Sequence, residues 1–425
     1  MNPWLAPTPT GMTRRHFMNH LAGSSAAMAA SSMMGSAIAA NASDMRRKQK
    51  SAILLWMGGG PATIDIWDLK PGAPTGGPFR PITTTGEGQI CEHMPMMAQQ
   101  MHNASIVRSM STREADHTRG RYYMHTGFVP NPNIEHPSYG SVISHELIDQ
   151  RSGLEIPPFV AVGGAGGGPG FLGMAWSPFS VTSNGQIRNM QNGMKGDQLR
   201  RRYAALQAIE SGFQKRTGDS AAVEHGKVLE KTFALMTSSQ MEAFRVEQEP
   251  DAMKERYGEN SFGQGCLLAR RLVEAGVPFV EVSLGGWDNH QNIHTTLADN
   301  KLPQLDRAMS ALYEDLESRG MLEDTVIIWM GEFGRTPRIN ENAGRDHFAR
   351  AWSCVVGGGK IQGGKVVGET SDDGMEVVSE SFSSEDLMTT VCKGLDISTD
   401  KTFTSNNGRP MKIAGGGRLI EDLLA

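Results

Sequence analysis

The chain has 425 residues, of which 39% are hydrophobic and 20% are charged. This composition supplies enough apolar material for a large core and excludes a globally disordered protein. Acidic residues exceed basic residues by 46 − 41 = 5, and the only basic block, Arg46–Lys50, is short, so we expect no nucleic-acid-binding surface. The four cysteines lie far apart without a CxxC pair, which excludes a zinc ribbon or a disulfide-dense scaffold. The 50 glycines indicate many tight turns and close backbone approaches.

The first 40 residues have the features of a twin-arginine export signal. Arg14 and Arg15 precede an aromatic residue, an apolar stretch rich in Ala, Ser and Met covers 21–40, and Ala37-Ile38-Ala39 offers a cleavage site. The alternative is a disordered basic tail followed by an Ala-rich helix. The apolar stretch is a weak membrane span, so we expect no stable span after cleavage. Export by this route delivers folded proteins, which favours a cofactor inserted in the cytoplasm and a location in the periplasm or cell envelope.

We therefore divide the chain into three parts. Residues 1–39 are the predicted signal peptide, residues 40–50 a polar linker, and residues 51–425 a single domain. Polar helical patterns indicate a helical insertion in this domain at about residues 197–256.

Beyond the linker, short apolar runs alternate with helical patterns. The runs predict buried strands at 51–57, 105–110, 158–162, 277–284, 325–330 and 351–356. Helical spacing and capping residues predict helices at 94–102, 119–125, 139–150, 197–213, 221–256, 262–275, 297–318 and 383–394. Apolar strands that alternate with helices are buried on both faces. The expected fold class is therefore α/β, with a mostly parallel central sheet sandwiched between helices.

Polar residues follow several of these strands, and in open α/β sheets ligands bind at the carboxyl ends of the strands. Asp288 and His290 follow the strand at 277–284. A carboxylate and an imidazole at short spacing suit a divalent cation such as zinc. His294 would join them only if that segment is helical. The alternative is a polar surface loop.

Two later segments add further candidates. His347 follows a glycine-containing loop and is a candidate metal ligand, and Asp346 is a candidate ligand or orienting partner. Glu332 stands at the end of the strand at 325–330 and could bind a cation. Arg335, three residues later, could clamp an anion or form a salt bridge with Glu332.

A predicted helix opens near residue 117 after a strand and a loop. A helix N-terminus favours an anion, and Arg119 and Arg121 add positive charge there. His117 or Thr118 could serve as a nucleophile or as an acid or base. The alternative is an ordinary helix cap with solvated arginines.

Five motifs together resemble a known family. They read GGGPATIDIWDLKPG (58–72), HTRGRYYMHTGF (117–128), GGWDNHQN (285–292), GEFGRTP (331–337) and GRDHF (344–348). From residue 51 to the C-terminus the chain resembles the alkaline phosphatase/sulfatase superfamily, and most closely a domain-of-unknown-function branch with twin-arginine signals. The resemblance implies an alkaline-phosphatase-like fold.

The chemistry of that superfamily carries over only in part. Sulfatases open a helix with C/S-x-P-S-R-x-x-x-L-T-G. Here Arg121 and the later Thr-Gly pair match, whereas His117 stands at the nucleophile position. Glycines replace the paired aspartates after the first strand, and Glu332 and Phe333 replace the Asp-His pair of a later strand. His347 resembles the last metal-binding histidine of the superfamily.

The resemblance implies an exported, metal-dependent hydrolase of phosphate or sulfate esters with a remodelled site. Five residues would hold one or two cations of zinc, calcium or manganese: Asp288, His290, Glu332, Asp346 and His347. Arg121 would hold the free oxygens of the anion, and His117 would be a nucleophile or general acid. The expected ligand is an anionic ester or a sulfated or phosphorylated glycan. The alternative is a catalytically degenerate protein that binds an anionic glycan or a partner protein, which the lost aspartates and Phe333 favour.

Overall fold

The computed structural model describes residues 49–424 except residues 152, 188–195 and 218–232. The predicted signal peptide at 1–39 and most of the predicted linker at 40–50 lie outside the described residues. Among the described residues, no helix combines the length and apolar character needed to span a membrane.

An eight-stranded sheet lies at the centre of the fold. Its strand order is β12 (Val366–Val367), β4 (Ala104–Met110), β11 (Trp352–Gly357), β8 (Thr325–Met330), β1 (Ser51–Gly58), β7 (Phe279–Gly285), β5 (Phe159–Val162) and β6 (Phe179–Val181). Strand β1 pairs in parallel with β7 and β8, and β5 pairs in parallel with β7 and β6. Strand β11 is antiparallel to both of its neighbours. The sheet is therefore mostly parallel, as the sequence predicts.

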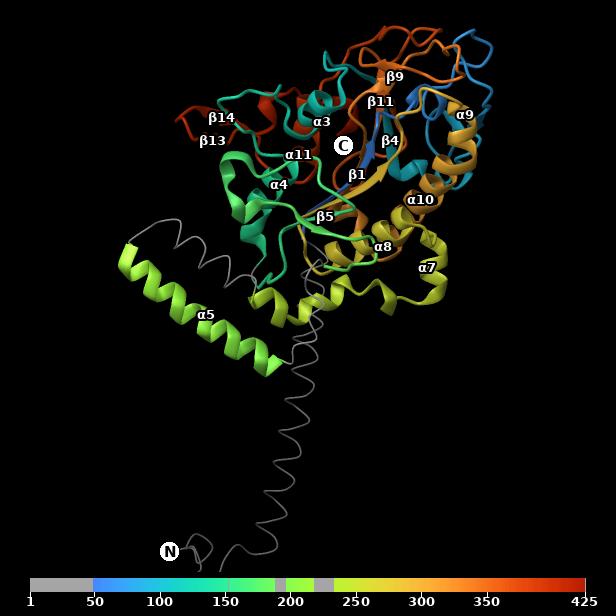
Figure 1. Cartoon of the computed structure of the whole chain (residues 1–425). Coiled ribbons are helices and arrows are strands. Elements are labelled where there is room, and N and C mark those ends of the chain that lie inside the picture. Colours follow the sequence, from blue (N-terminus) through green and yellow to red (C-terminus); the bar gives the residue numbers. More distant parts are fainter. Residues whose placement is uncertain (1–48, 152, 188–195, 218–232, 425) are drawn as a thin grey trace, which may run out of the picture. The chain divides into compact units, whose positions relative to one another are not determined.

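Helices cover both faces of this sheet (Figure 1). One face carries α3 (His117–Thr126), α4 (Tyr139–Leu147) and α11 (Ser384–Gly394), and the other carries α8 (Ser261–Glu274) and α10 (Leu302–Ser318). The buried side chains of β1 alternate between two clusters: Ile53 and Leu55 pack with α8 and α10, whereas Ala52 and Leu54 pack with the opposite layer. Burial on both faces explains why β1 is apolar throughout, and confirms the predicted α/β class.

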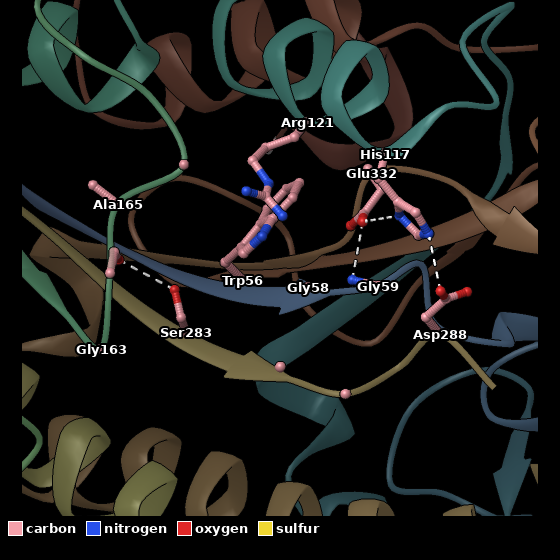
Figure 2. A pocket seen from close by; sticks show the side chains of 14 residues that line it. Trp56, Gly58, Gly59, His117, Arg121, Gly163, Ala165, Ser283, Asp288 and Glu332 are labelled. Carbon is pink, nitrogen blue, oxygen red and sulfur yellow. Dashed lines mark hydrogen bonds and ion pairs between the residues drawn. The ribbon is translucent and has the colours of Figure 1, made fainter.

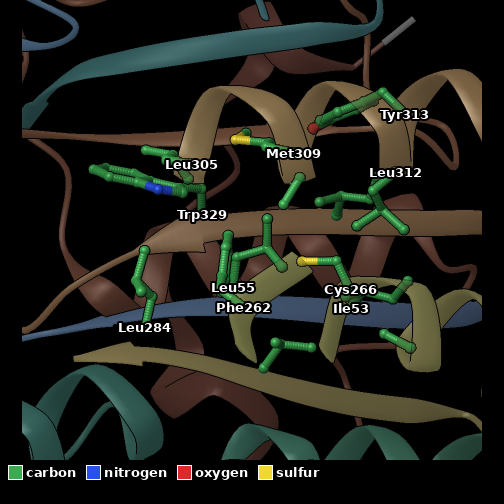
Figure 3. Close-up of a cluster of buried hydrophobic side chains, with 14 of the residues drawn as sticks. Ile53, Leu55, Phe262, Cys266, Leu284, Leu305, Met309, Leu312, Tyr313 and Trp329 are labelled. Atoms are coloured by element: carbon green, nitrogen blue, oxygen red, sulfur yellow. The ribbon is translucent and has the colours of Figure 1, made fainter. Parts of the chain in front are cut away.

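The larger of the two hydrophobic clusters lies between the sheet and helices α8 and α10 (Figure 3). Phe262 and Cys266 of α8 and Met309 of α10 lie against Leu55 and Trp329 of the sheet. Cys266 and the other three cysteines are all buried, and none of the four forms a disulfide.

Smaller elements complete the fold. Three two-stranded ladders pair β2 (Pro81–Thr83) with β3 (Gln89–Cys91), β9 (Gly334–Arg335) with β10 (His347–Phe348), and β13 (Thr402–Thr404) with β14 (Pro410–Lys412). Further α-helices in the described part of the chain include α2 (Pro95–Ala98), α5 (Gly196–Thr217), α7 (Asp251–Tyr257) and α9 (Ile293–Thr296).

Two helix predictions are confirmed only in part in the described residues. The helix predicted at 94–102 stops after one turn, because the carbonyl of Ala98 accepts the amide of Thr85 instead of an amide farther along the helix. The described part of 221–256 is helical at 233–237 and in α7, but short 3₁₀ turns separate these two stretches. Ser238 caps a new 3₁₀ turn there through the amide of Gln240, and Pro250 has no N–H with which to continue a helix.

Candidate functional site

The carboxyl ends of β5, β1, β7 and β8 border a cavity of about 560 Å³ that faces α3 (Figure 2). These strands are neighbours in the sheet, so the residues that follow them meet at one edge. The lining residues are Trp56, Gly58, Gly59, His117, Arg121, Gly163, Gly164, Ala165, Gly166, Ser283, Gly285, Gly286, Asp288 and Glu332.

Three predicted site residues could hold a cation at the rim of this cavity. His117, Asp288 and His347 each offer one ligand atom, and these atoms all lie within 4.8 Å of one another. The Nε2 atoms of His117 and His347 lie 3.4 and 3.3 Å from carboxylate oxygens of Asp288. They come from the start of α3, the segment after β7 and the start of β10.

Hydrogen bonds orient both imidazoles. Nδ1 of His117 lies 2.7 Å from Oε1 of Glu332, and Nδ1 of His347 lies 2.8 Å from the carbonyl oxygen of Ala115. A carbonyl can only accept, and an ionised carboxylate likewise, so Nδ1 is the donor in both rings, and in the Nδ1–H tautomer the lone pair of Nε2 faces Asp288, from which Nε2 of His347 lies 3.3 Å. Nε2 of His117 is buried and has no hydrogen-bond partner among the described residues. Metal-binding histidines are held in this way, so the residues fit a cation.

Arg335 holds the carboxylate of Asp288 ionised. Partial burial alone would raise the pKa of Asp288, but the hydrogen bond and charge of the Arg335 guanidinium more than offset this and lower the pKa to about 2. Arg335 is 2% exposed. Its five N–H groups meet the carbonyls of Gly59, Gly60 and Arg345, the carboxylate of Asp288 and Nε2 of His290. Arg335 therefore has no donor left for a ligand anion.

His290 and Asp346 lie beside this group. Nδ1 of His290 is 2.7 Å from Oδ1 of Asp346, and this hydrogen bond lowers the pKa of Asp346. Nε2 of His290 lies 2.9 Å from Asp288 and 3.3 Å from Nη1 of Arg335. The guanidinium of Arg335 thus lies at the place where a cation bound to Nε2 of His290 would have to sit. His294 does not join this group, because α9 begins only at Ile293; it lies 3.3 Å from Asp65 instead.

Glu332 is fully buried at the end of β8. Its Oε1 accepts the amide of Gly59 at 2.9 Å as well as Nδ1–H of His117, and its Oε2 has no partner within the described part of the chain. This carboxylate therefore orients His117 in the structure and lines the cavity.

The two arginines of α3 point to different surroundings. Arg119 makes a bidentate ion pair with Glu114 at 2.6 and 2.8 Å and does not line the cavity. Arg121 lines the cavity, and its guanidinium has no hydrogen bond or ion pair to any residue that the structure describes (Figure 2). Because Arg121 is four residues after His117, both lie on one face of the helix. Arg121 is thus placed to bind an anion next to the candidate cation.

The family model described as "Protein of unknown function (DUF1501)" matches residues 49–424. The chain belongs to this DUF1501 family. No curated protein sequence matches it.

Solved structures similar to this DUF1501 protein include three from bacteria. A protein in the alkaline phosphatase superfamily from Vibrio parahaemolyticus is 14% identical, with 89% of this chain and 71% of that chain covered and a TM-score of 0.38. A sulfatase from Pseudoalteromonas sp. is 11% identical, with coverages of 85% and 70% and a TM-score of 0.36. A phosphonate monoester hydrolase from Silicibacter pomeroyi is 9% identical, with coverages of 88% and 76% and a TM-score of 0.36.

Two buried polar pairs of this DUF1501 chain support the site, and the sequence pattern did not indicate either pairing. Arg345 binds Asp65 through two hydrogen bonds of 2.7 Å, and this pair fixes the segment that carries His347. Glu281 of β7 accepts the amide of Gly166 at 2.8 Å and lies 3.4 Å from Nε2 of His125. A charged residue inside the apolar run at 277–284 was the available signal for Glu281.

Proposed function

We propose that this protein is an exported, metal-dependent hydrolase of phosphate or sulfate esters. The observation that carries the proposal is the meeting of two imidazoles and one carboxylate, from His117, His347 and Asp288, at the edge of a cavity that His117, Asp288 and Arg121 line. A cation beside an anion-binding guanidinium is the combination that hydrolysis of such esters needs.

The donor set favours zinc or manganese over calcium. Imidazole nitrogens suit transition metals, whereas calcium takes about six to eight oxygen ligands. We propose one cation rather than two, because the guanidinium of Arg335 already lies against Asp288 and His290. A second cation there would be repelled by this buried positive charge.

When bound, the cation would supply Lewis acidity to the ester and to an attacking water molecule. The chain's own residues have three tasks around it. Arg121 binds the free oxygens of the ester, as its place in the cavity allows. Glu332 keeps the proton of His117 on Nδ1, so that Nε2 stays a ligand. Arg335 keeps Asp288 ionised and fixed.

We assign His117 to the cation rather than to nucleophilic attack. Its Nε2 faces Oδ2 of Asp288 at 3.4 Å, and the space between two such ligand atoms suits a positive ion. A nucleophilic His117 would instead form a covalent N–P or N–S adduct on Nε2 during turnover. Mass spectrometry of the acid-sensitive adduct in protein quenched at high pH separates the two assignments.

The location and natural ligands are also proposals. The twin-arginine pattern at Arg14 and Arg15 supports export to the periplasm or cell envelope. Sulfated or phosphorylated glycans are the anionic esters that we propose as ligands in that setting.

A catalytically degenerate protein that binds an anionic glycan or a partner protein is the second candidate. Phe333 favours it, because its ring centroid lies 5.1 Å from that of His117 and 4.8 Å from that of His347, where the family resemblance expects a metal-binding histidine. Such a protein would bind the ester without releasing product.

Elemental analysis of the signal-cleaved protein, purified without chelators, tests the proposal first. We expect about one zinc or manganese per chain, followed by release of 4-nitrophenol from 4-nitrophenyl phosphate or 4-nitrophenyl sulfate. Metal uptake without product release from any ester would favour the degenerate candidate. A protein that neither contains nor takes up a divalent cation would exclude the metal-dependent mechanism.

A further inference from the structure

Two glycines on the floor of the cavity are required neither by the backbone nor by packing. Gly58 ends β1 and Gly285 ends β7, and the two are partners in the sheet register. Neither has a positive φ. Among the described atoms, a Cβ on Gly285 would meet nothing within 4 Å, and a Cβ on Gly58 would come no closer than 3.5 Å to the Trp56 ring. Alanine would fit at both positions.

Glycine weakens a strand, and here neither a turn nor a steric clash requires it. The presence of glycine at these two positions therefore needs another explanation. Glycine in a strand often marks the close approach of a second backbone or of a ligand. For Gly285, no backbone of the described residues lies within 4 Å of the added carbon. A ligand is the remaining reason for the missing side chain.

Both glycines face the cavity. Side chains two residues apart in a strand point to the same face, so Gly58 shares its face with Trp56, and Gly285 shares its face with Ser283. Figure 2 shows Trp56 and Ser283 on the side of the sheet below Arg121, and all four residues line the cavity. The glycines therefore expose a strip of bare backbone next to the candidate anion site.

The two carbonyls of this strip and the hydroxyl beside it already form hydrogen bonds. The carbonyl of Gly58 accepts the amide of Trp287, and the carbonyl of Gly285 accepts Nζ of Lys301 at 2.7 Å. The hydroxyl of Ser283 donates to the carbonyl of Gly164 at 3.2 Å. The strip thus presents peptide planes and Cα hydrogens, which suit the flat face of a ring better than a second charge.

We propose that Gly58 and Gly285 form the subsite for a ring in the alcohol portion of the ester, and that they determine specificity for esters with such a ring. The inference rests on the proposed function, because it takes the ester anion to be held by Arg121 and the candidate cation. The cavity volume of about 560 Å³ is in the range of sites for organic ligands and exceeds what an inorganic anion fills.

Filling the strip with a side chain tests the subsite. Gly285→Ala and Gly285→Val add increasing volume above the floor, and valine also favours a strand, so the melting temperature should stay equal or rise. Gly168→Ala is the matched control. Gly168 also has no positive φ, its added Cβ would meet only Glu135 at 3.7 Å, and it does not line the cavity.

The readout uses two non-hydrolysable probes that differ mainly in the ring. Calorimetric titration of zinc-loaded protein with phenylphosphonate and methylphosphonate should show tighter binding of phenylphosphonate by the wild type. Gly285→Val should lose at least about tenfold in phenylphosphonate affinity, with Gly285→Ala in between, and should change methylphosphonate affinity by less than about twofold. Gly168→Ala should bind both probes like the wild type.

The other outcomes distinguish failure of the ring subsite from failure of the proposed function. Undiminished phenylphosphonate binding by Gly285→Val, or equal affinity of the wild type for both probes, would overturn the ring subsite and leave the proposed function standing. A zinc-loaded wild type that binds neither phosphonate would instead count against the proposed function, and the subsite would fall with it.

Discussion

Replacing His347 by alanine tests the candidate metal site most directly. The change removes one of three ligand groups and leaves His117 and Asp288 in place. The side chain of His347 is 27% exposed, and among the described residues it makes two polar contacts, from Nδ1 to the carbonyl of Ala115 and from Nε2 to Asp288. The fold therefore loses at most two hydrogen bonds, each of which contributes about 0.5–1.5 kcal/mol to the free energy of unfolding.

The loss in metal affinity should be larger than the loss in stability. Removing a group that merely orients a metal ligand typically lowers affinity by about 10- to 100-fold, so removing the ligand itself should cost more than about 100-fold. At about 1.4 kcal/mol per tenfold change, this is more than about 2.8 kcal/mol of zinc-binding free energy. Competition with a chromophoric chelator measures the affinity, and thermal unfolding of the metal-free protein measures the stability.

His102→Ala provides the control for this experiment. The side chain of His102 is 46% exposed and contacts Thr85 and the carbonyl of Gln99, away from the cavity. This variant should bind zinc like the wild type. If His347→Ala also keeps wild-type zinc affinity, His347 is not a ligand and the site as assembled here is wrong.

Three further predictions follow from the described contacts. Arg121→Ala should weaken binding of inorganic sulfate or phosphate by about tenfold or more with unchanged metal content, because a charged hydrogen bond contributes about 1.5–3 kcal/mol; Arg119→Ala should bind like the wild type in the same calorimetric titration, and equal losses in both would contradict the placement. Asp65→Asn leaves the buried guanidinium of Arg345 without its counter-charge and should lower the free energy of unfolding in urea by about 3–5 kcal/mol, whereas a loss below about 1 kcal/mol would refute the pairing. Burial raises the pKa of Asp306 to about 6, so the folded protein resists ionisation of this carboxyl group. The free energy of unfolding should therefore fall by about 3 kcal/mol as pH rises from about 4 through 6, for a shift of roughly two pKa units. Asp306→Asn should remove this part of the pH dependence, and an equal change in melting temperature between pH 4 and 7 for both proteins would refute the prediction.

The strands were predictable because they are buried on both faces. The runs at 51–57 and 325–330 contain almost only apolar residues, and the structure confirms them as β1 and β8 with boundaries shifted by at most one residue. The direction of β11 was not predictable. Its side chains are buried like those of a parallel strand, and nothing in the run at 351–356 records that it pairs antiparallel with β4 and β8.

The candidate site divides in a similar way. Residues that follow strands, such as Asp288, could be found from the sequence because strand ends meet at one edge of a parallel sheet. Arg121 and Arg119 lie on different faces of α3. The spacing of four residues between His117 and Arg121 indicates in the sequence that these two share a face. The role of Arg335 was not readable, because three of its five acceptors are main-chain carbonyls, which have no sequence signature.

The ligand groups at His117, Asp288 and His347 belong to segments that follow β4, β7 and β9, and only the folded chain brings these segments together. An unfolded chain offers no such trio, so a cation at this position would bind the native state alone and add to its stability by mass action, by about 2.7 kcal/mol at a hundredfold excess over the dissociation constant. Bound metal would then report correct folding. A chain that retains the ion during purification has its central strands in register, and a misfolded chain can be recognised because it does not bind the ion.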